Sequence, residues 1–452
     1  MRYLPHTAQE VECMLQTVGV DRIDRLFEGI PDHLRLKRPL DLPPAKDEEA
    51  LVRRLRALAA KNEGSADRQA LFLGAGCHAH HIPAAVNQLL LRGEFFTAYT
   101  PYQPETSQGT LQAIFEYQSM LAELMGCEVV NASMYDGATA TAEAALMALR
   151  VQKKRSRILL ARSLHPELRQ VCGTFMSELP TPPEEVNFGA QGTVDLAALS
   201  AALDAQVAAV VVQQPNFLGC LEDLPQLVKM VHDAGALLVV AVLEPVSLGL
   251  LEAPGKLGAD IVTGEGMSLG TGMNFGGPGL GMFGSKSQYL WQMPGRLVGQ
   301  TRDQQGQRGF VLTLSTREQH IRRARATSNI CSNEGLCALA AAIHLSLIGK
   351  EGFSRLARTN AANARFALAA LEQTGQVKRI YPAPFFNEFA IRLSKDPQAI
   401  LERLLEKGIL GGVPLQRFYP DHPELARSLL VCVTEQNQPE EVARYQEVLK
   451  ST

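Results

Sequence analysis

The sequence has little that would place it in a membrane. Its most apolar strand-like segments, such as residues 208–212 and 236–243, are far shorter than the roughly 20 residues that a spanning helix needs. The N-terminus, which reads Met-Arg-Tyr-Leu-Pro-His, has no apolar core of the kind found in signal peptides. We therefore expect a cytoplasmic protein with no membrane partner.

Paired cysteines and clustered charge are also missing. None of the eight cysteines forms a Cys-x-x-Cys pair, which argues against a disulfide framework or a structural zinc site in a chain of this length. The net charge is −3 and the densest positive run, residues 153–155, is too short to indicate a nucleic-acid partner. Metal-ligand types gather at Cys77, His78, His80 and His81. Because no second close pair is visible in the sequence, we favour a structural turn there over a metal site.

Alternating strand and helix patterns dominate the middle of the chain. We expect an N-terminal helical segment over residues 1–70, a large α/β domain over 71–325 and a smaller C-terminal α/β domain over 326–452. Within the large domain, β-branched runs at 158–160, 208–212, 237–242 and 261–262 alternate with amphipathic segments at 139–150, 195–203 and 225–234. This alternation predicts a mainly parallel sheet with helices on both faces. Such sheets bind ligands at the carboxyl ends of their strands.

Residues 131–143 combine a turn with the start of a strong helix. Asp136, Gly137 and Thr139 lie in that turn. Free backbone amides and the helix dipole at such a position attract a phosphate, so these residues are candidates for a phosphate-binding turn. An ordinary helix with Asp136 as its N-cap accounts for the same residues and is the more common arrangement.

Two further segments have the composition of functional loops. Residues 263–281 are dense in glycine, but they come late in the α/β region and no helix pattern follows, so they do not form a nucleotide-binding fingerprint. We expect a loop that packs closely, for example against another subunit. Residues 97–109 are stiffened by two prolines and carry aromatic and hydroxyl groups, which suits either the wall of a site or a structural turn.

Several long stretches together point to one family. They are Arg-Tyr-Leu-Pro-x-Thr at residues 2–7, the stretch 18–31, Thr-Pro-Tyr-Gln-Pro-Glu at 100–105, Ser-Gln-Gly at 107–109, Asn-Ala-Ser at 131–133, Gly-Gly-Pro-Gly at 276–279 and the stretch 316–331. The chain resembles the P-protein of the glycine cleavage system, the component that carries pyridoxal phosphate (PLP), and in particular its N-terminal-type, or alpha, subunit. The resemblance runs nearly end to end. It implies the aminotransferase-like architecture of fold type I PLP enzymes, in agreement with the α/β pattern.

The resemblance also implies where a catalytic lysine would stand. In the catalytic subunit, a His-Lys-Thr follows the strand before the glycine-rich loop, and its lysine forms the Schiff base with PLP. Here that position falls on Met267 or Ser268, and no lysine occurs between Lys256 and Lys286. Without an amine, PLP has no covalent anchor in this chain.

A second group of the PLP site is missing as well. PLP needs a carboxylate beneath its pyridinium nitrogen to act as an electron sink. The resemblance places that aspartate at Ala241. The nearest acid is Glu244, which directly precedes Pro245 in what we expect to be a turn. Two losses in one site indicate a degenerate site.

The resemblance therefore implies a non-catalytic subunit of glycine dehydrogenase (decarboxylating). PLP would be held by a homologous lysine-bearing subunit, subunit 2, in a dimer of heterodimers. Glycine would be decarboxylated there, and its aminomethyl group would pass to the lipoyl arm of H-protein. Active sites of this fold lie at subunit interfaces, so this chain would contribute residues to its partner's site. The candidates are Tyr99, Thr100, Tyr102, Gln103, Glu105, Gln108, Ser328 and Asn329.

Other interpretations stay open at this point. The basic stretch from Arg317 to Arg325, including His320, would serve the dimer interface or the site. A PLP-free scaffold or binding protein of the same fold, without a role in glycine cleavage, is the main alternative. A self-sufficient PLP enzyme that uses another lysine is a further one, but no other lysine stands at a suitable strand end.

Overall fold

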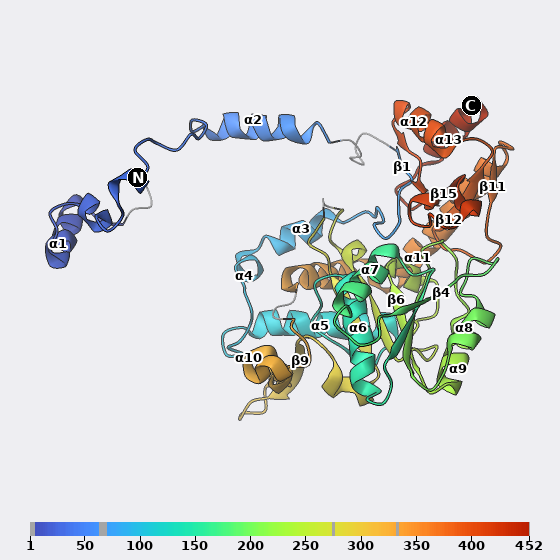
Figure 1. Cartoon of the computed structure of the whole chain (residues 1–452), viewed down its shortest axis with the longest axis horizontal. Helices are drawn as coiled ribbons and strands as arrows, with labels where there is room; N and C mark the ends of the chain where they lie inside the picture. Colours follow the sequence, from blue (N-terminus) through green and yellow to red (C-terminus); the bar gives the residue numbers. More distant parts are fainter. Residues whose placement is uncertain (1–4, 63–69, 274–275, 331–333, 452) are drawn as a thin grey trace. The chain divides into compact units, whose positions relative to one another are not determined.

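The computed structural model describes residues 5–62, 70–273, 276–330 and 334–451 (Figure 1). The first residues of the 2–7 motif, positions 274–275 of the glycine-rich stretch and Cys331 lie outside these ranges. The chain divides into two units, Met1–Glu63 and Gly64–Thr452, which are described separately. The predicted boundary near residue 325, within the second unit, stays a prediction.

The described part of the first unit, residues 5–62, is here called the N-terminal arm. Its helix α1 (Ala8–Val18) begins with the capping box that Thr7 and Glu10 predict: the Thr7 amide donates to the Glu10 carboxylate at 2.6 Å, and the Glu10 amide donates to the Thr7 hydroxyl at 3.3 Å. After η1 (Ile23–Phe27) and η2 (Asp32–Leu34) comes α2 (Glu48–Ala59). None of these helices has a buried residue, so the arm has no core of its own.

The second unit, here called the body, is built on a seven-stranded sheet of order β2-β8-β7-β6-β5-β3-β4. Only β8 runs antiparallel to its neighbours. This mainly parallel sheet confirms the predicted fold class. The strands are β2 (Val129–Val130), β3 (Arg157–Ala161), β4 (Glu184–Val186), β5 (Val207–Gln213), β6 (Leu237–Val242), β7 (Ile261–Glu265) and β8 (Gly281–Ser285).

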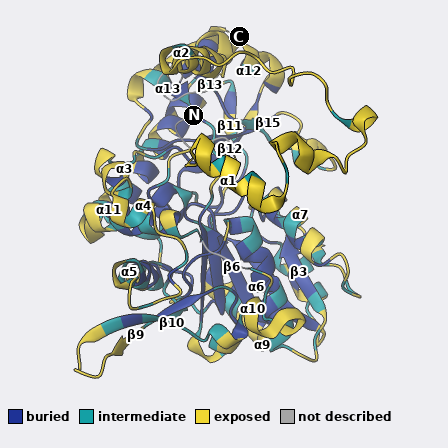
Figure 2. Ribbon diagram, turned by 90° about the vertical axis from the view of Figure 1, so that its left-hand side faces the viewer, coloured by how far each residue is buried: buried dark blue, intermediate teal, exposed yellow. Residues whose placement is uncertain are grey.

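Helices cover both faces of this sheet, because successive side chains of its central strands point to opposite sides. Val210 and Val212 of β5 pack on the face that α5 and α11 cover, whereas Ala209 and Val211 pack on the face that α6 and α7 cover. Figure 2 shows the central strands as the most deeply buried part of the body. The helices up to the C-terminal region are α3 (Ala84–Leu90), α4 (Gly93–Phe96), α5 (Gln108–Met125), α6 (Gly137–Val151), α7 (Pro166–Phe175), α8 (Leu196–Ala202), α9 (Leu224–Asp233), α10 (Gln319–Arg322) and α11 (Gly335–Glu372).

The C-terminal region has its own antiparallel sheet of order β11-β12-β15-β14. Two small pairings complete the body: a parallel pair of β1 and β13, and an antiparallel hairpin of β9 and β10, which the sequence did not predict. The bounds are β1 (Ala70–Leu71), β9 (Leu297–Arg302), β10 (Arg308–Thr313), β11 (Val377–Arg379), β12 (Glu388–Leu393), β13 (Ile409–Leu410), β14 (Val413–Pro414), β15 (Ser428–Cys432), α12 (Pro397–Glu406) and α13 (Pro439–Ser451). Short 3-10 turns are η3 (Pro245–Gly249), η4 (Met267–Leu269), η5 (Ser287–Gln292), η6 (Ser315–Arg317), η7 (Arg323–Arg325), η8 (Leu415–Arg417) and η9 (Pro423–Leu425).

The glycine-rich stretch is less of a loop than the sequence predicted. Strand β7 continues to Glu265 instead of ending near residue 262, and β8 begins at Gly281. Glycine is needed here for close packing: a Cβ at Gly264 would lie 2.2 Å from the backbone oxygen of Val242. Dense glycine therefore marks tight backbone contacts between strands as well as a turn.

The helix α11 has 38 residues and, judged by its length and composition alone, is long and apolar enough to cross a membrane. Its place in the body accounts for that composition, because its buried side packs against α5, α3 and α13. Gly349, at φ +62°, interrupts the helical backbone of α11.

Candidate functional site

The carboxyl end of β7 is where the family resemblance implies that a catalytic lysine would stand. Strand β7 ends at Glu265, and the short turn η4 follows with Met267 and the buried Ser268. Lys286 does not reach this end of the strand, because its Nζ is bonded to Asp260, which precedes β7, at 2.6 Å. Lys256 is an exposed residue that lies 3.5 Å from Glu123. Neither lysine stands where a Schiff base would form.

The neighbouring strand provides no acid for a cofactor ring. Ala241 is fully buried in β6, between β5 and β7. Glu244, the nearest acid along the chain, is buried too, and its carboxylate is engaged by His80 at 3.0 Å and by Asn387 at 2.9 Å. As expected, Glu244 begins a turn, since its side chain caps η3 through the amide of Val246.

The turn that opens α6 holds carboxylates in place of an open anion site. Asp136 is the N-cap, and its Oδ1 accepts hydrogen bonds from the Thr139 amide at 2.7 Å and from the Thr139 hydroxyl at 3.0 Å. The amide of Gly137 donates to Glu265 at 3.0 Å. The structure therefore has the capped helix that was one of the two interpretations. With no amine, no acid on β6 and its turn already bonded to carboxylates, this site does not fit PLP.

The loop of residues 97–109 meets the 316–331 stretch at Arg296. The Arg296 guanidinium donates to the Tyr102 hydroxyl at 2.8 Å and to the Thr100 hydroxyl at 3.3 Å, and it pairs with Glu318 at 3.2 Å. It also lies over the Tyr102 ring, 5.1 Å from the ring centroid, and His320 approaches that ring edge-on. Arg296 itself is only 4 % exposed. Arg296 was not predicted as a site residue, because a single arginine before an unpredicted strand has no recognisable sequence pattern.

The other candidates of the loop lie differently. Tyr99 is 83 % exposed, and Gln103 and Glu105 are exposed as well. Gln108 is the first residue of α5, and both its amide nitrogen and its amide oxygen bond to the backbone of Phe310 on β10, at 2.8 and 2.9 Å. Gln108 thus connects α5 to the β9–β10 hairpin.

Ser328 and Asn329 lie beside the N-terminal half of α6. The Ser328 hydroxyl donates to Glu143 at 2.6 Å, and Arg150 lies 3.7 Å from the same carboxylate. Burial raises the pKa of Glu143, although Ser328 and Arg150 oppose that rise. Asn329 is exposed. A small pocket is lined by Ser328 and Thr327 together with the buried Arg296 and Arg317.

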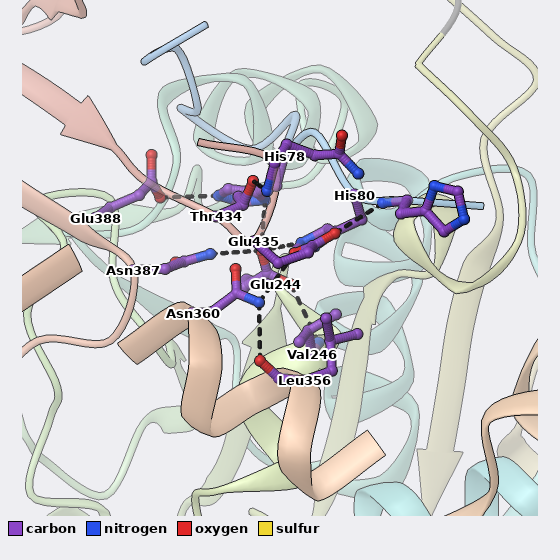
Figure 3. Close-up of polar contacts among 12 residues, drawn as sticks. His78, His80, Glu244, Val246, Leu356, Asn360, Asn387, Glu388, Thr434 and Glu435 are labelled. Atoms are coloured by element: carbon purple, nitrogen blue, oxygen red, sulfur yellow. Dashed lines mark hydrogen bonds and ion pairs between the residues drawn. The ribbon is translucent and has the colours of Figure 1, made fainter. Parts of the chain in front are cut away.

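The histidines near Cys77 belong to a buried network of charges (Figure 3). His78 bonds to Glu388 at 2.9 Å, and His80 bridges Glu244 at 3.0 Å and Glu435 at 2.9 Å. The network joins the segment after β1 to the end of β6, to β12 and to the segment after β15. Its carboxylates come from far along the chain, so the sequence alone could not connect them to the histidines.

The charges of this network hold one another ionised. Burial alone would lower the pKa of His80, but Glu244 and Glu435 outweigh it and raise that pKa to about 10. Burial alone would raise the pKa of Glu244, but His80 and His78 lower it to about 2. His78, Glu388 and Cys432 also lie close enough for a metal ion. Because His78 and Glu388 already pair, and burial raises the pKa of the Cys432 thiol well above its usual value, ion pairing explains this cluster.

Known proteins resemble the chain over its full length. The family model for the glycine cleavage system P-protein matches residues 1–449. A probable glycine dehydrogenase (decarboxylating) subunit 1 of Anaeromyxobacter dehalogenans is 52% identical over 451 residues, with 100% of both chains covered. A protein of the same name from Carboxydothermus hydrogenoformans is 48% identical, with 99% of each chain covered.

Solved structures agree with this result. A crystal structure of glycine decarboxylase (P-protein) of the glycine cleavage system, in inhibitor-bound form, superimposes with a TM-score of 0.90 at 44% identity and covers 100% of both chains. The sphingosine-1-phosphate lyase of Burkholderia pseudomallei has a TM-score of 0.67 at 17% identity and covers 93% of this chain and 94% of its own. This second likeness shows the fold alone.

Proposed function

The chain belongs to the glycine cleavage system P-protein family, and we propose that it is the non-catalytic subunit of a two-subunit glycine dehydrogenase (decarboxylating). A homologous lysine-bearing subunit holds PLP and decarboxylates glycine, and the aminomethyl group passes to the lipoyl arm of H-protein. The observation that carries this proposal is the carboxyl end of β7, where Met267 and Ser268 provide no amine and Ala241 provides no acid on β6. The full-length family match disfavours a scaffold without a role in glycine cleavage.

Within the assembly, the chain's role is to complete its partner's site. We propose that the loop of residues 99–108 orders the pocket for the glycine carboxylate or the entrance for the lipoyl arm. Thr100 and Tyr102 have the strongest support, because Arg296 fixes both in place. Tyr99, Gln103 and Glu105 are exposed and free to face a partner, whereas Gln108 holds the base of the loop.

The second contribution to the partner's site is proposed for Ser328 and Asn329. Asn329 is exposed, and Ser328 lines a small pocket together with the buried Arg296 and Arg317. Hydroxyl, amide and guanidinium groups are suited to bind a phosphate. These residues would hydrogen-bond the phosphate of the PLP that the partner holds.

The N-terminal arm supports an association with another protein. Large apolar side chains are exposed along it, at Met14, Val18, Ile23, Leu26, Phe27, Ile30, Leu34, Leu36, Leu40, Leu42, Leu51, Val52, Leu55 and Leu58. Each would contribute about 1.5–3 kcal/mol if it became fully buried. The arm has ten acidic and ten basic residues, so it has no net charge to attract nucleic acid or an acidic membrane. An apolar protein surface, such as that of the partner subunit, fits it best.

Reductive trapping tests the proposal. The chain alone is incubated with PLP and reduced with borohydride, and its peptides are searched by mass spectrometry for a pyridoxyl-modified lysine. We expect no stoichiometric adduct on this chain. After mixing with the lysine-bearing homologue, we expect an adduct on the homologue and glycine-dependent release of CO2. A stoichiometric adduct on one lysine of this chain would make it a complete PLP enzyme and overturn the proposal.

A further inference from the structure

The carboxylate of Glu265 occupies an anion-binding position in this chain. It accepts hydrogen bonds from three backbone amides: Gly137 at 3.0 Å, Met267 at 3.0 Å and Leu280 at 2.8 Å. These amides come from the first residue of α6, from η4 and from the segment before β8. Three amides that converge on one anion are the arrangement by which proteins bind phosphate groups.

The helix behind this carboxylate strengthens the position for an anion. Helix α6 has 15 residues and is largely buried, so its first turn presents the positive end of a helix dipole in a region of low dielectric. Gly137, at its start, donates to Glu265, and Thr139, two residues later, donates to Asp136. Two of the amides that could hold a phosphate are therefore already bonded to carboxylates of the chain itself.

Close packing leaves little space for a second anion there. A Cβ at Gly137 would lie 3.0 Å from the backbone nitrogen of Glu265, and a Cβ at Gly279 would lie 3.1 Å from the Glu265 carboxylate and 3.0 Å from the Cβ of Asp136. The backbone thus closes around the Glu265 side chain. A phosphate could enter only if that side chain left.

The surrounding charge also opposes a phosphate. Burial raises the pKa of Glu265, and Asp136 raises it further, although the three backbone hydrogen bonds oppose both effects. Burial and Asp136 likewise raise the pKa of Glu334. Over the part of the chain that the structure describes, Asp136, Glu265 and Glu334 form no ion pair with lysine or arginine.

We propose that Glu265 is a built-in substitute for the cofactor phosphate: its carboxylate fills the anion position at the start of α6 and closes this chain's own site to PLP. The degenerate site is then a structural junction between β7 and α6 and no longer a weak cofactor site. A consequence that rests on the proposed function is that each pair of chains binds one PLP. The place of Glu265 in the fold does not depend on that partner.

Phosphate-dependent stability tests the substitution directly. The full-length chain, its Glu265→Ala and Glu265→Gln variants and the control Glu252→Ala, which changes an exposed glutamate, are melted in chloride and in phosphate at matched ionic strength. In chloride, we expect Glu265→Ala to lower the Tm by a few degrees, because three buried amides lose their acceptor. In phosphate, we expect part of that loss to be recovered, since inorganic phosphate can enter the emptied position. Wild type and Glu252→Ala should gain only the general stabilisation that phosphate, an excluded anion, gives any folded protein, and Glu265→Ala should gain more than either.

Two results would overturn the inference. One is an equal response of wild type and Glu265→Ala to phosphate, which would mean that Glu265 does not block the position. The other is two PLP molecules bound for each pair of chains in the wild-type complex, measured by release of the cofactor in alkali. If Glu265→Ala does not fold, Glu265→Gln decides: its amide retains one oxygen acceptor, so we expect a smaller loss of Tm and a smaller phosphate response, but one still above wild type. Because the melting experiment needs neither partner nor activity, its failure is distinguishable from a failure of the proposed function.

Discussion

Arg296 is the residue that connects the two stretches proposed to serve the partner's site. Its fork of donors contacts the hydroxyls of Thr100 and Tyr102 while it pairs with Glu318. A lysine keeps the charge but cannot maintain this geometry, because its ammonium is a compact point charge and has no planar fork of N–H donors. A hydrogen bond from a charged group contributes about 1.5–3 kcal/mol, so its loss is enough to displace the loop.

We predict that Arg296→Lys lowers kcat/KM for glycine in the reconstituted complex by about tenfold, which corresponds to about 1.4 kcal/mol. Tyr102→Phe should act in the same direction and less strongly, because it removes one acceptor of the Arg296 fork and leaves the ring. Arg302→Lys is the matched control, since Arg302 lies at the far end of β9 and is exposed. Glycine-dependent CO2 release measures all three. Full activity in both Arg296→Lys and Tyr102→Phe would remove the loop from the partner's site.

The position of the Glu265 carboxylate could not be predicted from the sequence. The sequence indicated the absence of a lysine and of an aspartate, because a familiar position lacks a familiar residue there. It did not indicate that a carboxylate had entered the phosphate position, because Glu265 lies in a glycine-rich stretch whose last strand residues were expected to be loop. The contact of Glu265 with Gly137 spans 128 residues of sequence, which no local pattern can report.

At the scale of elements, strands with strong periodicity were predictable and those set by contacts were not. Strand β6, and strand β5 up to its last residue Gln213, are continuous runs of valine, leucine and alanine, which is typical of a parallel sheet with both faces buried. The hairpin of β9 and β10 carries arginine, glutamine and threonine at its exposed end, so its sequence looks like loop. Its pairing depends on Gln108 and on packing against α5, which are tertiary contacts.

The charge network around His80 also joins secondary-structure elements that lie far apart in the sequence. It connects the segment after β1 to β6, to β12 and to α11, where Asn360 donates to Glu435 at 3.0 Å. The ionisable groups that face one another in it are His78, His80, Glu244, Glu388, Glu435 and Cys432. Since each histidine lies between carboxylates, the stability of this junction must depend on pH.

We predict a plateau of stability between the ordinary pKa values of glutamate and histidine. The pKa of His80 is raised from 6.5 to about 10, so its contribution is complete below pH 6.5 and is lost as the pH rises towards 10. The pKa of Glu244 is lowered from 4.5 to about 2, as is that of Glu435, so their contributions are complete above pH 4.5 and are lost as the pH falls towards 2. Thermal melting of the full chain across this pH range measures the effect.

The substitution His80→Gln tests, in the same thermal melting across pH, how much His80 contributes to this pH dependence. It leaves Glu244 and Glu435 without the cation that they share, so we expect a loss of about 3 kcal/mol in the free energy of unfolding near pH 6. We also expect a flatter decline of the Tm above pH 6.5 than in wild type, because the group that titrates there is gone. The exposed His33, in the arm, provides the control His33→Gln, which should leave both the Tm and its pH profile unchanged. A variant with the wild-type alkaline slope would show that His80 does not govern it.

In the molecule as a whole, the two units differ in how much of their apolar surface they bury internally. The body buries its strands and has cores on both faces of its main sheet. The N-terminal arm has capped helices, but none of its described residues is buried. Isolated helices of 11 and 12 residues are marginal in water even with good caps, so the arm needs another surface in order to be stable. Composition could predict the helices of the arm, but only the structure shows that they share no core.

We predict that the arm is required for assembly with the lysine-bearing subunit. A chain that begins at residue 64 should keep the Tm of the body, because the helices and strands of the body form hydrophobic cores with one another. Its association with the partner should weaken at least about a hundredfold, which corresponds to about 2.7 kcal/mol, the gain from burying one or two of the arm's leucines.

Replacing Leu51 and Leu55, one turn apart on α2, by serine tests the same surface without truncation, and Glu48→Gln with Arg56→Gln on the same helix is the polar control. Analytical ultracentrifugation of the mixed subunits measures the affinity. A truncated chain that melts earlier but binds its partner as tightly as the full chain would mean that the arm covers its own body, and the assembly would then have to rest on the body alone.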